Sequence, residues 1–231
     1  MPKAKLIKSG PQRRTPLSRE RIAQAALELI DDEGLESCSM RRLGARLGVE
    51  AMALYHHFPS KGGLLDAVMD RLLDEVELPA PGTQPPLQRL RVCIRSYRGC
   101  AIRHPRAFVL LAARRFNTER AFAFYESLLG VFEELGLDAG QSARWFRLIG
   151  GFASGSGLAE VASRERVADA TSLQLEHAPE RIAYPRVRAV APHLSVQKLD
   201  EVFEFGLDVL FEALAARTHG ARSQAAGSST S

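Results

Sequence analysis

Residues 39–58 carry two short stretches of helical apolar spacing, separated by a single glycine, Gly48. Ser39 can cap the first stretch, whose apolar side chains recur on one helical face: Met40, Leu43 and Leu47. Gly48 permits a tight turn, after which residues 51–58 are again helical in pattern until Pro59 disfavours continuation. A short helix, a glycine turn and a second helix form a helix-turn-helix, a motif whose second helix can enter the major groove of DNA.

Two longer helices flank this motif. The first begins after Ser18 and ends at Gly34, and the other begins after Ser60 and carries apolar residues as far as Val76. Four prolines within residues 78–86 then exclude both a helix and a central strand. We therefore expect a flexible basic arm at 1–17, a helix-turn-helix DNA-binding domain at 18–60 and a connecting helix at 61–77.

The rest of the chain is also helical in pattern, and no alternating strand pattern of useful length occurs. Helical spacing is found in 87–103, 106–115, 118–135, 139–163 and 195–217. We expect a long loop at 164–194 with one short helix near 186–190, and a disordered tail at 218–231, which is rich in Ser, Gly and Ala. The expected fold class is all-α, with three N-terminal helices and a connecting helix followed by a larger helical domain at 87–217.

The positive charge of the chain is concentrated at its N-terminus. The formal net charge is +4; residues 1–61 carry eleven Lys and Arg against seven Asp and Glu, and the remainder carries twenty of each sign. Residues 1–19 hold six basic side chains and no acidic one. Basic side chains near phosphates release condensed counterions, so this arm favours a polyanion such as DNA. A solubilising disordered tail is the alternative.

Composition limits the class of protein further. The chain has no uninterrupted apolar stretch of roughly 20 residues, the length of a membrane span, and its first residues lack the apolar segment of a secretory signal. We expect a cytoplasmic protein with no membrane partner. Cys38, Cys93 and Cys100 have no CxxC spacing, which favours buried thiols over disulfides or zinc; a redox pair of Cys93 and Cys100 is the alternative.

The sequence resembles the tetracycline-repressor (TetR) family of regulators over residues 18–73. The segments that carry the likeness, in the family's order and spacing, are Leu47-Gly48-Val49, Leu54-Tyr55-His56-His57-Phe58, Ser60-Lys61 and Leu64-Leu65. Gly62 and Gly63 depart from the acidic or helix-forming residues common there. The resemblance implies a homodimer that binds a double-stranded DNA operator through the third helix and a small-molecule effector in its C-terminal domain.

The resemblance also implies which side chains contact DNA: Arg41, Arg42, Ala51, Met52, Ala53, Tyr55, His56, His57 and Lys61. Met52 would meet a thymine methyl group, and Arg41 matches the family position that commonly reaches DNA. Plainer interpretations remain for some of them, because Tyr55 also suits packing and Arg42 also suits a solvated face. A metal pair at His56 and His57 is disfavoured, since helix neighbours point about 100° apart.

Two segments of the larger domain favour dimerisation. Glycine in a helix interior costs nearly 1 kcal/mol relative to alanine, so the four glycines within 150–157 indicate close approach of a helix, in the subunit or across a twofold axis, or else a kink near Gly155. Helix 195–217 is apolar on more than one side, which is wider than the stripe of a surface helix. The expected interface residues are Gly151, Gly155, Phe203, Leu207, Leu210 and Phe211.

The effector pocket that the family implies lies among the central helices of the larger domain. Leu110 and Ala113 stand where chelate-binding members use a histidine and a threonine, and neither can bind metal. We therefore expect no magnesium, no cofactor and a small, largely apolar effector. The expected lining residues are Phe108, Leu110, Ala113, Tyr125, Leu128, Trp145 and Ile149, although aromatic side chains at these spacings also suit a plain core.

No GxSxG, HExxH, P-loop or GxGxxG motif occurs, so we do not expect an enzyme. The predicted function is a sequence-specific transcriptional regulator, a repressor released from a palindromic operator by its effector. The alternatives are an architectural or non-specific DNA-binding protein without an effector, and a helical ligand-binding protein that has lost its DNA function.

Overall fold

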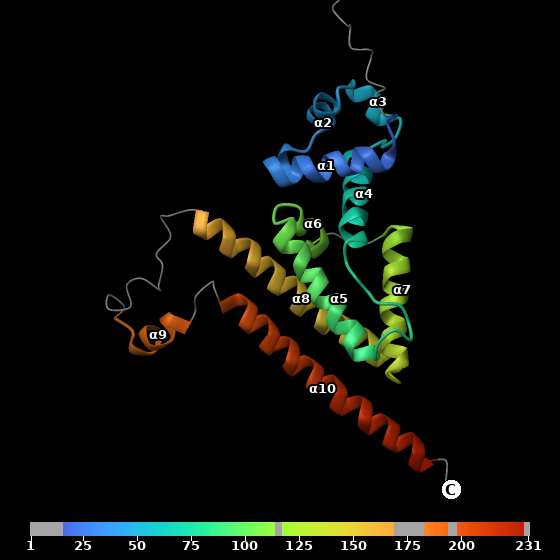
Figure 1. The fold of residues 1–231 in the computed structure, drawn as a ribbon, viewed down its shortest axis with the longest axis vertical. Helices are drawn as coiled ribbons and strands as arrows, with labels where there is room; N and C mark the ends of the chain where they lie inside the picture. Colours follow the sequence, from blue (N-terminus) through green and yellow to red (C-terminus); the bar gives the residue numbers. More distant parts are fainter. Residues whose placement is uncertain (1–15, 114–116, 169–182, 194–197, 229–231) are drawn as a thin grey trace, which may run out of the picture.

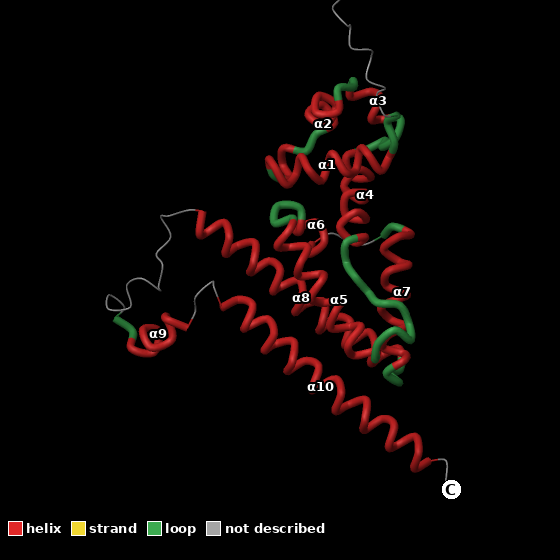
Figure 2. Tube along the Cα trace, in the orientation of Figure 1, coloured by secondary structure: helices red, strands yellow, loops and turns green. Residues whose placement is uncertain are grey.

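The fold consists of helices throughout the part of the chain that the structure describes. The computed structural model describes residues 16–113, 117–168, 183–193 and 198–228. Figure 2 shows helices joined by loops, with no strand in these ranges. The expected all-α fold class is confirmed. In chain order the helices are α1 (Arg19–Glu33), η1 (Leu35–Ser37), α2 (Met40–Leu47), α3 (Ala51–Tyr55), α4 (Lys61–Asp74), α5 (Pro86–Arg103), α6 (Phe108–Ala113), α7 (Glu119–Glu134), α8 (Ala139–Ala168), α9 (Pro185–Val190), η3 (Ala191–His193) and α10 (Leu199–Ser228).

Serines and glycines define the ends of the N-terminal helices, as the sequence predicts. The Oγ atoms of Ser18, Ser39 and Ser60 each accept a hydrogen bond from the backbone N–H three residues on, at 3.2, 3.3 and 3.1 Å. Gly34 and Gly48 follow the last residues of α1 and α2 with φ of 89° and 68°, which residues with a side chain rarely adopt. Local sequence therefore determines the lengths of α1 and α2.

Several helices differ in length from the prediction, and the connecting helix α4 ends at Asp74 instead of at residue 77. Helix α3 ends at Tyr55 and not at Phe58, because the N–H groups of His57 and Phe58 both donate to the Leu54 carbonyl and the chain turns to bury Phe58. Helix α8 continues without a break to residue 168, through the glycines at 150–157. Helix α10 continues to residue 228, beyond the point where a tail was expected, which agrees with the helix-forming Ala, Arg and Gln residues at 221–226.

Two hydrophobic clusters form the interior. The first contains side chains from all four N-terminal helices together with side chains of α5, α6 and α7, including Phe58, Leu72, Cys100 and Phe108. The second joins α5, α7, α8 and α10. Figure 1 shows α4 leading from the N-terminal helices toward the second half of the molecule. Because the first cluster crosses between the halves, their relative placement depends on packing as well as on the linker at 78–86.

Packing within the subunit explains one of the α8 glycines. A Cβ atom added at Gly157 would lie 2.4 Å from the Phe108 ring and 3.2 Å from the Ala101 Cβ, so a side chain there would collide with α6 and crowd α5. The other three positions, Gly150, Gly151 and Gly155, have no side-chain or distant backbone atom within 4 Å of an added Cβ. Close approach within the subunit therefore accounts for Gly157 alone.

Three arginines of α5 form ion pairs with α10. The pairs, in antiparallel order, are Arg91–Asp208 at 2.5 Å, Arg95–Glu204 at 2.6 Å and Arg98–Asp200 at 2.7 Å. The Arg98 guanidinium also lies 4.7 Å from the centre of the Phe203 ring, and the Arg91 guanidinium lies 4.8 Å from that of Phe211. These contacts direct one face of α10 toward α5 and leave another face exposed.

Candidate DNA-binding surface and ligand cavity

Buried side chains hold the helix-turn-helix motif together. Leu43 of α2, Leu54 of α3 and the following Phe58 are fully buried in the first hydrophobic cluster. Gly44 lies where α2 meets the start of α3, and a Cβ there would lie 2.8 Å from the Val49 carbonyl oxygen and 3.3 Å from the Ala51 nitrogen. The two helices thus cross at a contact between backbones, which fixes the position of α3.

The exposed side of α3 carries most of the predicted DNA contacts. Met52 is 64% exposed and Tyr55 is 42% exposed, although both are large and apolar in part. Arg41, His56 and Lys61 are also exposed, whereas Ala51, Ala53 and His57 are half-buried. Figure 1 shows α3 at one end of the molecule, far from α10. Large side chains exposed on a rigid frame are typical of a surface that binds a partner.

The two predicted arginines of α2 differ in their contacts. Arg42 forms an ion pair with Glu33 of α1, and the neighbouring Arg46 forms one with Asp32 at 2.7 Å. No ion pair of Arg41 is seen among the described residues. Arg19 supports the turn after α3, because its guanidinium donates to the His57 carbonyl and lies 4.1 Å from the centre of the Phe58 ring. The charged side chain most available on α2 is therefore that of Arg41.

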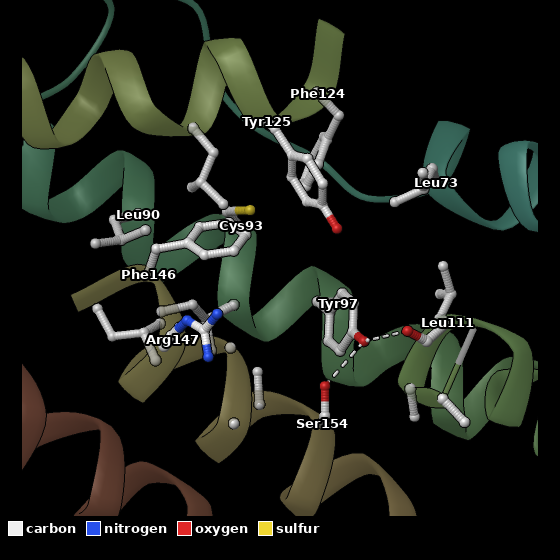
Figure 3. Close-up of a pocket in the computed structure, with 18 residues that line it drawn as sticks. Leu73, Leu90, Cys93, Tyr97, Leu111, Phe124, Tyr125, Phe146, Arg147 and Ser154 are labelled. Atoms are coloured by element: carbon white, nitrogen blue, oxygen red, sulfur yellow. Dashed lines mark hydrogen bonds between the residues drawn. The ribbon is translucent and has the colours of Figure 1, made fainter. Parts of the chain in front are cut away.

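A cavity of about 280 Å³ lies inside the larger domain, between α4, α5, α6, α7 and α8. Figure 3 shows the aromatic side chains that line it, Tyr97, Phe124, Tyr125 and Phe146. Leu73 of α4 reaches its wall, so the helix that follows the DNA-binding domain touches the cavity directly. The lining residues are Leu73, Leu90, Cys93, Ile94, Tyr97, Leu111, Ala112, Ala113, Phe124, Tyr125, Leu128, Phe146, Arg147, Ile149, Gly150, Gly151, Ala153 and Ser154.

Four of the seven predicted pocket residues line this cavity: Ala113, Tyr125, Leu128 and Ile149. The other three are absent from its wall. Phe108 and Leu110 are buried in the first cluster, with Phe108 against Gly157, and Trp145 packs on the second cluster. The prediction missed the contribution of α5, although Leu90, Cys93, Ile94 and Tyr97 follow the helical spacing of a single stripe. That stripe could have been found, but periodicity alone does not distinguish a cavity wall from a core.

The polar groups of the cavity are few. The Tyr97 hydroxyl donates to the Leu111 carbonyl at 3.3 Å and shares a hydrogen bond of 3.1 Å with the Ser154 hydroxyl, which links α5, α6 and α8. Burial raises the pKa of Tyr97, and it raises that of Tyr125 to about 12. Both phenols are therefore neutral hydrogen-bonding groups at neutral pH. Arg147 is the one charged side chain among the lining residues that the structure describes.

The three cysteines are buried free thiols, as the sequence predicts. Cys93 lies on the cavity wall, and burial raises its pKa to about 12, with a smaller contribution from nearby Cys100. A thiol with so high a pKa is a weak nucleophile. Cys93 therefore contributes a small apolar surface to the cavity.

A second exposed apolar surface follows α8 and α10. On α10 the exposed residues Val202, Phe205 and Val209 recur at helical spacing, and Phe205 is 70% exposed. On α8 the exposed residues of one stripe are Leu148, Gly151, Gly155 and Leu158. Among the predicted interface residues, Gly151 and Gly155 lie on this surface. The prediction that Phe203, Leu207 and Phe211 lie at the interface is corrected, because these side chains are buried in the core of their own subunit. Leu210 packs beside them.

Neither a membrane-spanning helix nor a cluster of metal ligands occurs among the described residues. None of their helices is both long and apolar enough to cross a bilayer. Within the same ranges, no three His, Cys, Asp or Glu side chains converge as the ligands of a metal ion would.

Both halves of the chain match families of known proteins. Residues 22–68 match the family described as bacterial regulatory proteins, tetR family, and residues 78–218 match the tetracyclin repressor-like, C-terminal domain. The HTH-type transcriptional repressor DrrR1 of Streptomyces coeruleorubidus is 31% identical over 154 residues, which are 64% of this chain and 56% of that repressor. The class A tetracycline repressor of Escherichia coli is 28% identical over 88% of this chain and 93% of its own length. The crystal structure of ActR of Streptomyces coelicolor in complex with actinorhodin has a TM-score of 0.76 and 26% identity, and covers 88% of this chain and 99% of that one.

Proposed function

Because this chain belongs to the tetracycline-repressor (TetR) family, it is a DNA-binding transcriptional regulator, and we propose that it is a homodimeric repressor released from a palindromic operator by a small, largely apolar effector. Regulators of this family bind operator DNA, dimerise and bind small-molecule effectors, and they are generally not enzymes. The proposal extends these properties to the surfaces of this chain.

One observation carries the DNA-binding part. Met52 and Tyr55 are exposed on a short helix whose Leu54 is fully buried, so the frame of α3 is rigid while its outer face is free. Arg41 and Lys61 supply exposed positive charge at the start of α2 and of α4. We propose that Met52, with Ala51 and Ala53, contacts base edges. The remaining predicted residues, Arg42, Tyr55, His56 and His57, with Arg41 and Lys61, would contact phosphates or bases.

The cavity favours an effector with an aromatic or other flat apolar body. Four aromatic side chains contribute to its wall: Tyr97, Phe124, Tyr125 and Phe146. With Arg147 as its one charged lining residue among those described, the cavity suits a neutral or acidic molecule better than a cation. ActR, which has a similar fold, binds the small molecule actinorhodin, and this supports the proposal of a small-molecule effector.

The hydrogen bonds of Tyr97 suggest how the effector would act. An effector that competes for the Tyr97 hydroxyl would loosen its bond to the Leu111 carbonyl of α6, and α6 packs directly on α4. A shift of α4 would change the separation of the two α3 helices in the dimer. Successive major grooves require a separation of about 34–36 Å, so a small tilt weakens operator binding.

The DNA-binding surface is tested by Tyr55→Ala and Lys61→Ala. We expect each variant to bind the operator about tenfold more weakly, because each removes a contact in both subunits without touching the core. Fluorescence anisotropy with an operator selected from random DNA measures the affinity, and Lys61→Ala should also flatten its dependence on salt. Tyr184→Ala, which removes an exposed tyrosine beside α9, is the control. Unchanged affinity in both variants would remove α3 and the start of α4 from the interface.

The charge of the cavity is tested by Arg147→Met. We expect the wild-type chain to bind flat aromatic acids more tightly than their primary amides, and Arg147→Met to reduce this preference by about tenfold. Binding can be followed through Trp145, the one tryptophan of the chain. Arg144→Met, on the same helix but outside the cavity wall, should bind like wild type. A wild-type preference for amides or cations contradicts the argument.

A further inference from the structure

The imidazole ring of His104 lies between the DNA-binding domain and the ligand-binding domain. Its Nδ1 atom is 2.6 Å from the Asp31 Oδ2 atom of α1, and its Nε2 atom is 3.0 Å from the Glu75 Oε1 atom at the end of α4. The His104 backbone N–H donates to the Cys100 carbonyl at 2.8 Å and ends α5. One side chain thus joins the ends of three helices that belong to different parts of the molecule.

This geometry requires an extra proton. A neutral imidazole has one N–H donor and one nitrogen lone pair, so it can donate to only one of two carboxylates, and its lone pair would face the other. Both bonds form when His104 is an imidazolium ion, with the two carboxylates ionised. The arrangement therefore corresponds to the protonated state of this group of side chains.

The surrounding charges are consistent with that state. The Arg103 Nε atom donates to the Glu75 Oε2 atom at 2.8 Å, and Arg106 donates to the carbonyls of Asp31 and Asp32. The two carboxylates thus face the Arg103 guanidinium and the His104 imidazolium, while the Arg106 guanidinium lies at the adjacent carbonyls of α1. Cys100 also lies beside Arg103, and burial raises its pKa to about 11, so it stays protonated at neutral pH. Loss of the His104 proton would remove one of its two hydrogen bonds and leave a nitrogen lone pair facing a carboxylate at the contact between the domains.

The position of His104 connects both sites of the proposed function. His104 begins the short segment that leads into α6, and α6 forms part of the cavity wall through residues 111–113. Asp31 lies near the end of α1, the helix on which α2 packs, and α2 in turn packs against α3. We propose that His104, Asp31 and Glu75 form a proton-controlled joint that holds the DNA-binding domain in the orientation for operator binding, so that deprotonation of His104 weakens that binding. The DNA part of this inference rests on the proposed function.

The direction of the pH effect follows from the hydrogen bond. The bond to Asp31 raises the pKa of His104 above its ordinary value of 6.5, and Glu75 adds to this effect while burial opposes it. A group with a raised pKa contributes its stabilisation fully below the ordinary value and loses it as the pH rises through the raised value. The joint is therefore complete in mildly acidic solution and opens as the solution becomes alkaline.

The joint itself can be measured without DNA. In the full-length chain with isotope-labelled histidine, we expect the His104 ring resonances to titrate above the ordinary histidine range, and to shift toward that range in Asp31→Asn. The spectrum of His104→Gln identifies the His104 signals, and His193, an exposed histidine remote from the joint, is the internal reference. An ordinary pKa for His104 in the wild-type chain, or an unchanged one in Asp31→Asn, overturns the joint.

The regulatory consequence is tested with an operator selected from random DNA, titrated between about pH 6 and pH 8.5. All other ionisable side chains are common to both proteins, so the result is the difference between wild type and His104→Gln. We expect wild-type affinity to fall about fivefold more than that of His104→Gln over this range, the lower end of typical coupling between sites. His193→Gln should follow wild type. Equal pH dependence in wild type and His104→Gln overturns the regulatory inference, whereas absence of selected DNA at every pH refutes the proposed function.

Discussion

Gly44→Val is expected to disrupt the helix-turn-helix motif and to abolish operator binding. A Cβ atom alone would lie 2.8 Å from the Val49 carbonyl oxygen, and this neighbour is backbone, which cannot rotate away as a side chain does. Valine adds two methyl groups to that clash, so α3 must separate from α2. We expect a loss of about 3 kcal/mol in the free energy of unfolding, the upper end for an overpacked core. Urea unfolding followed by circular dichroism measures it.

The matched control for this prediction is Gly130→Val on α7. An added Cβ at Gly130 meets nothing within 4 Å, so the same substitution there should leave both stability and operator affinity close to wild type. If Gly44→Val unfolds at the same urea concentration as Gly130→Val and still binds the operator, the backbone contact between α2 and α3 is not needed to position α3.

Phe205→Arg is expected to separate the dimer and to lower operator affinity by about a hundredfold or more. Phe205 is 70% exposed at the centre of an apolar stripe on α10, and a C₂ interface would bring two such side chains together. An arginine there places two positive charges in an apolar contact. Two linked DNA-binding domains gain roughly 10²–10⁴ in affinity over one, and a monomer loses that gain. Sedimentation velocity measures the mass, and anisotropy measures the affinity.

Phe122→Arg controls for the introduction of a charged side chain. Phe122 is 58% exposed on α7, outside the surface formed by α8 and α10. We expect this variant to remain dimeric and to bind the operator like wild type. A Phe205→Arg chain that sediments as a dimer at the same protein concentration would show that another surface holds the subunits together.

The sequence predicts the residues of the proposed DNA-binding surface more completely than those of the cavity. The proposed DNA-binding residues lie within one continuous segment, so the resemblance of that segment to the TetR family was sufficient to nominate them, and the capping serines, Gly34 and Gly48 explain its local structure. The cavity is built from five helices, and the prediction of its lining residues omitted the stripe on α5. Apolar spacing on α5 is the same whether that face meets a neighbour or an empty space. Only the positions of α7 and α8 decide whether that face of α5 is part of the core or a cavity wall.

The proposed dimer surface shows the same limit of prediction from sequence. Phe203, Leu207 and Phe211 were chosen because α10 is apolar on more than one side, and that observation is correct. The ion pairs from α5 to Asp200, Glu204 and Asp208 turn the Phe203 face inward and leave Phe205 exposed. A helix with two apolar faces does not reveal which one its own subunit buries, since that choice depends on partners distant in sequence.

Helix order, the capped ends of α1 and α2, and the family of this protein follow from the amino-acid sequence by itself, because caps, turns and apolar spacing act over a few residues. The tertiary structure alone decided where the cavity lies, which face of α10 is free, and that His104 joins Asp31 to Glu75. These last features bring together residues that are tens of positions apart, and only the packing of whole helices determines such distances.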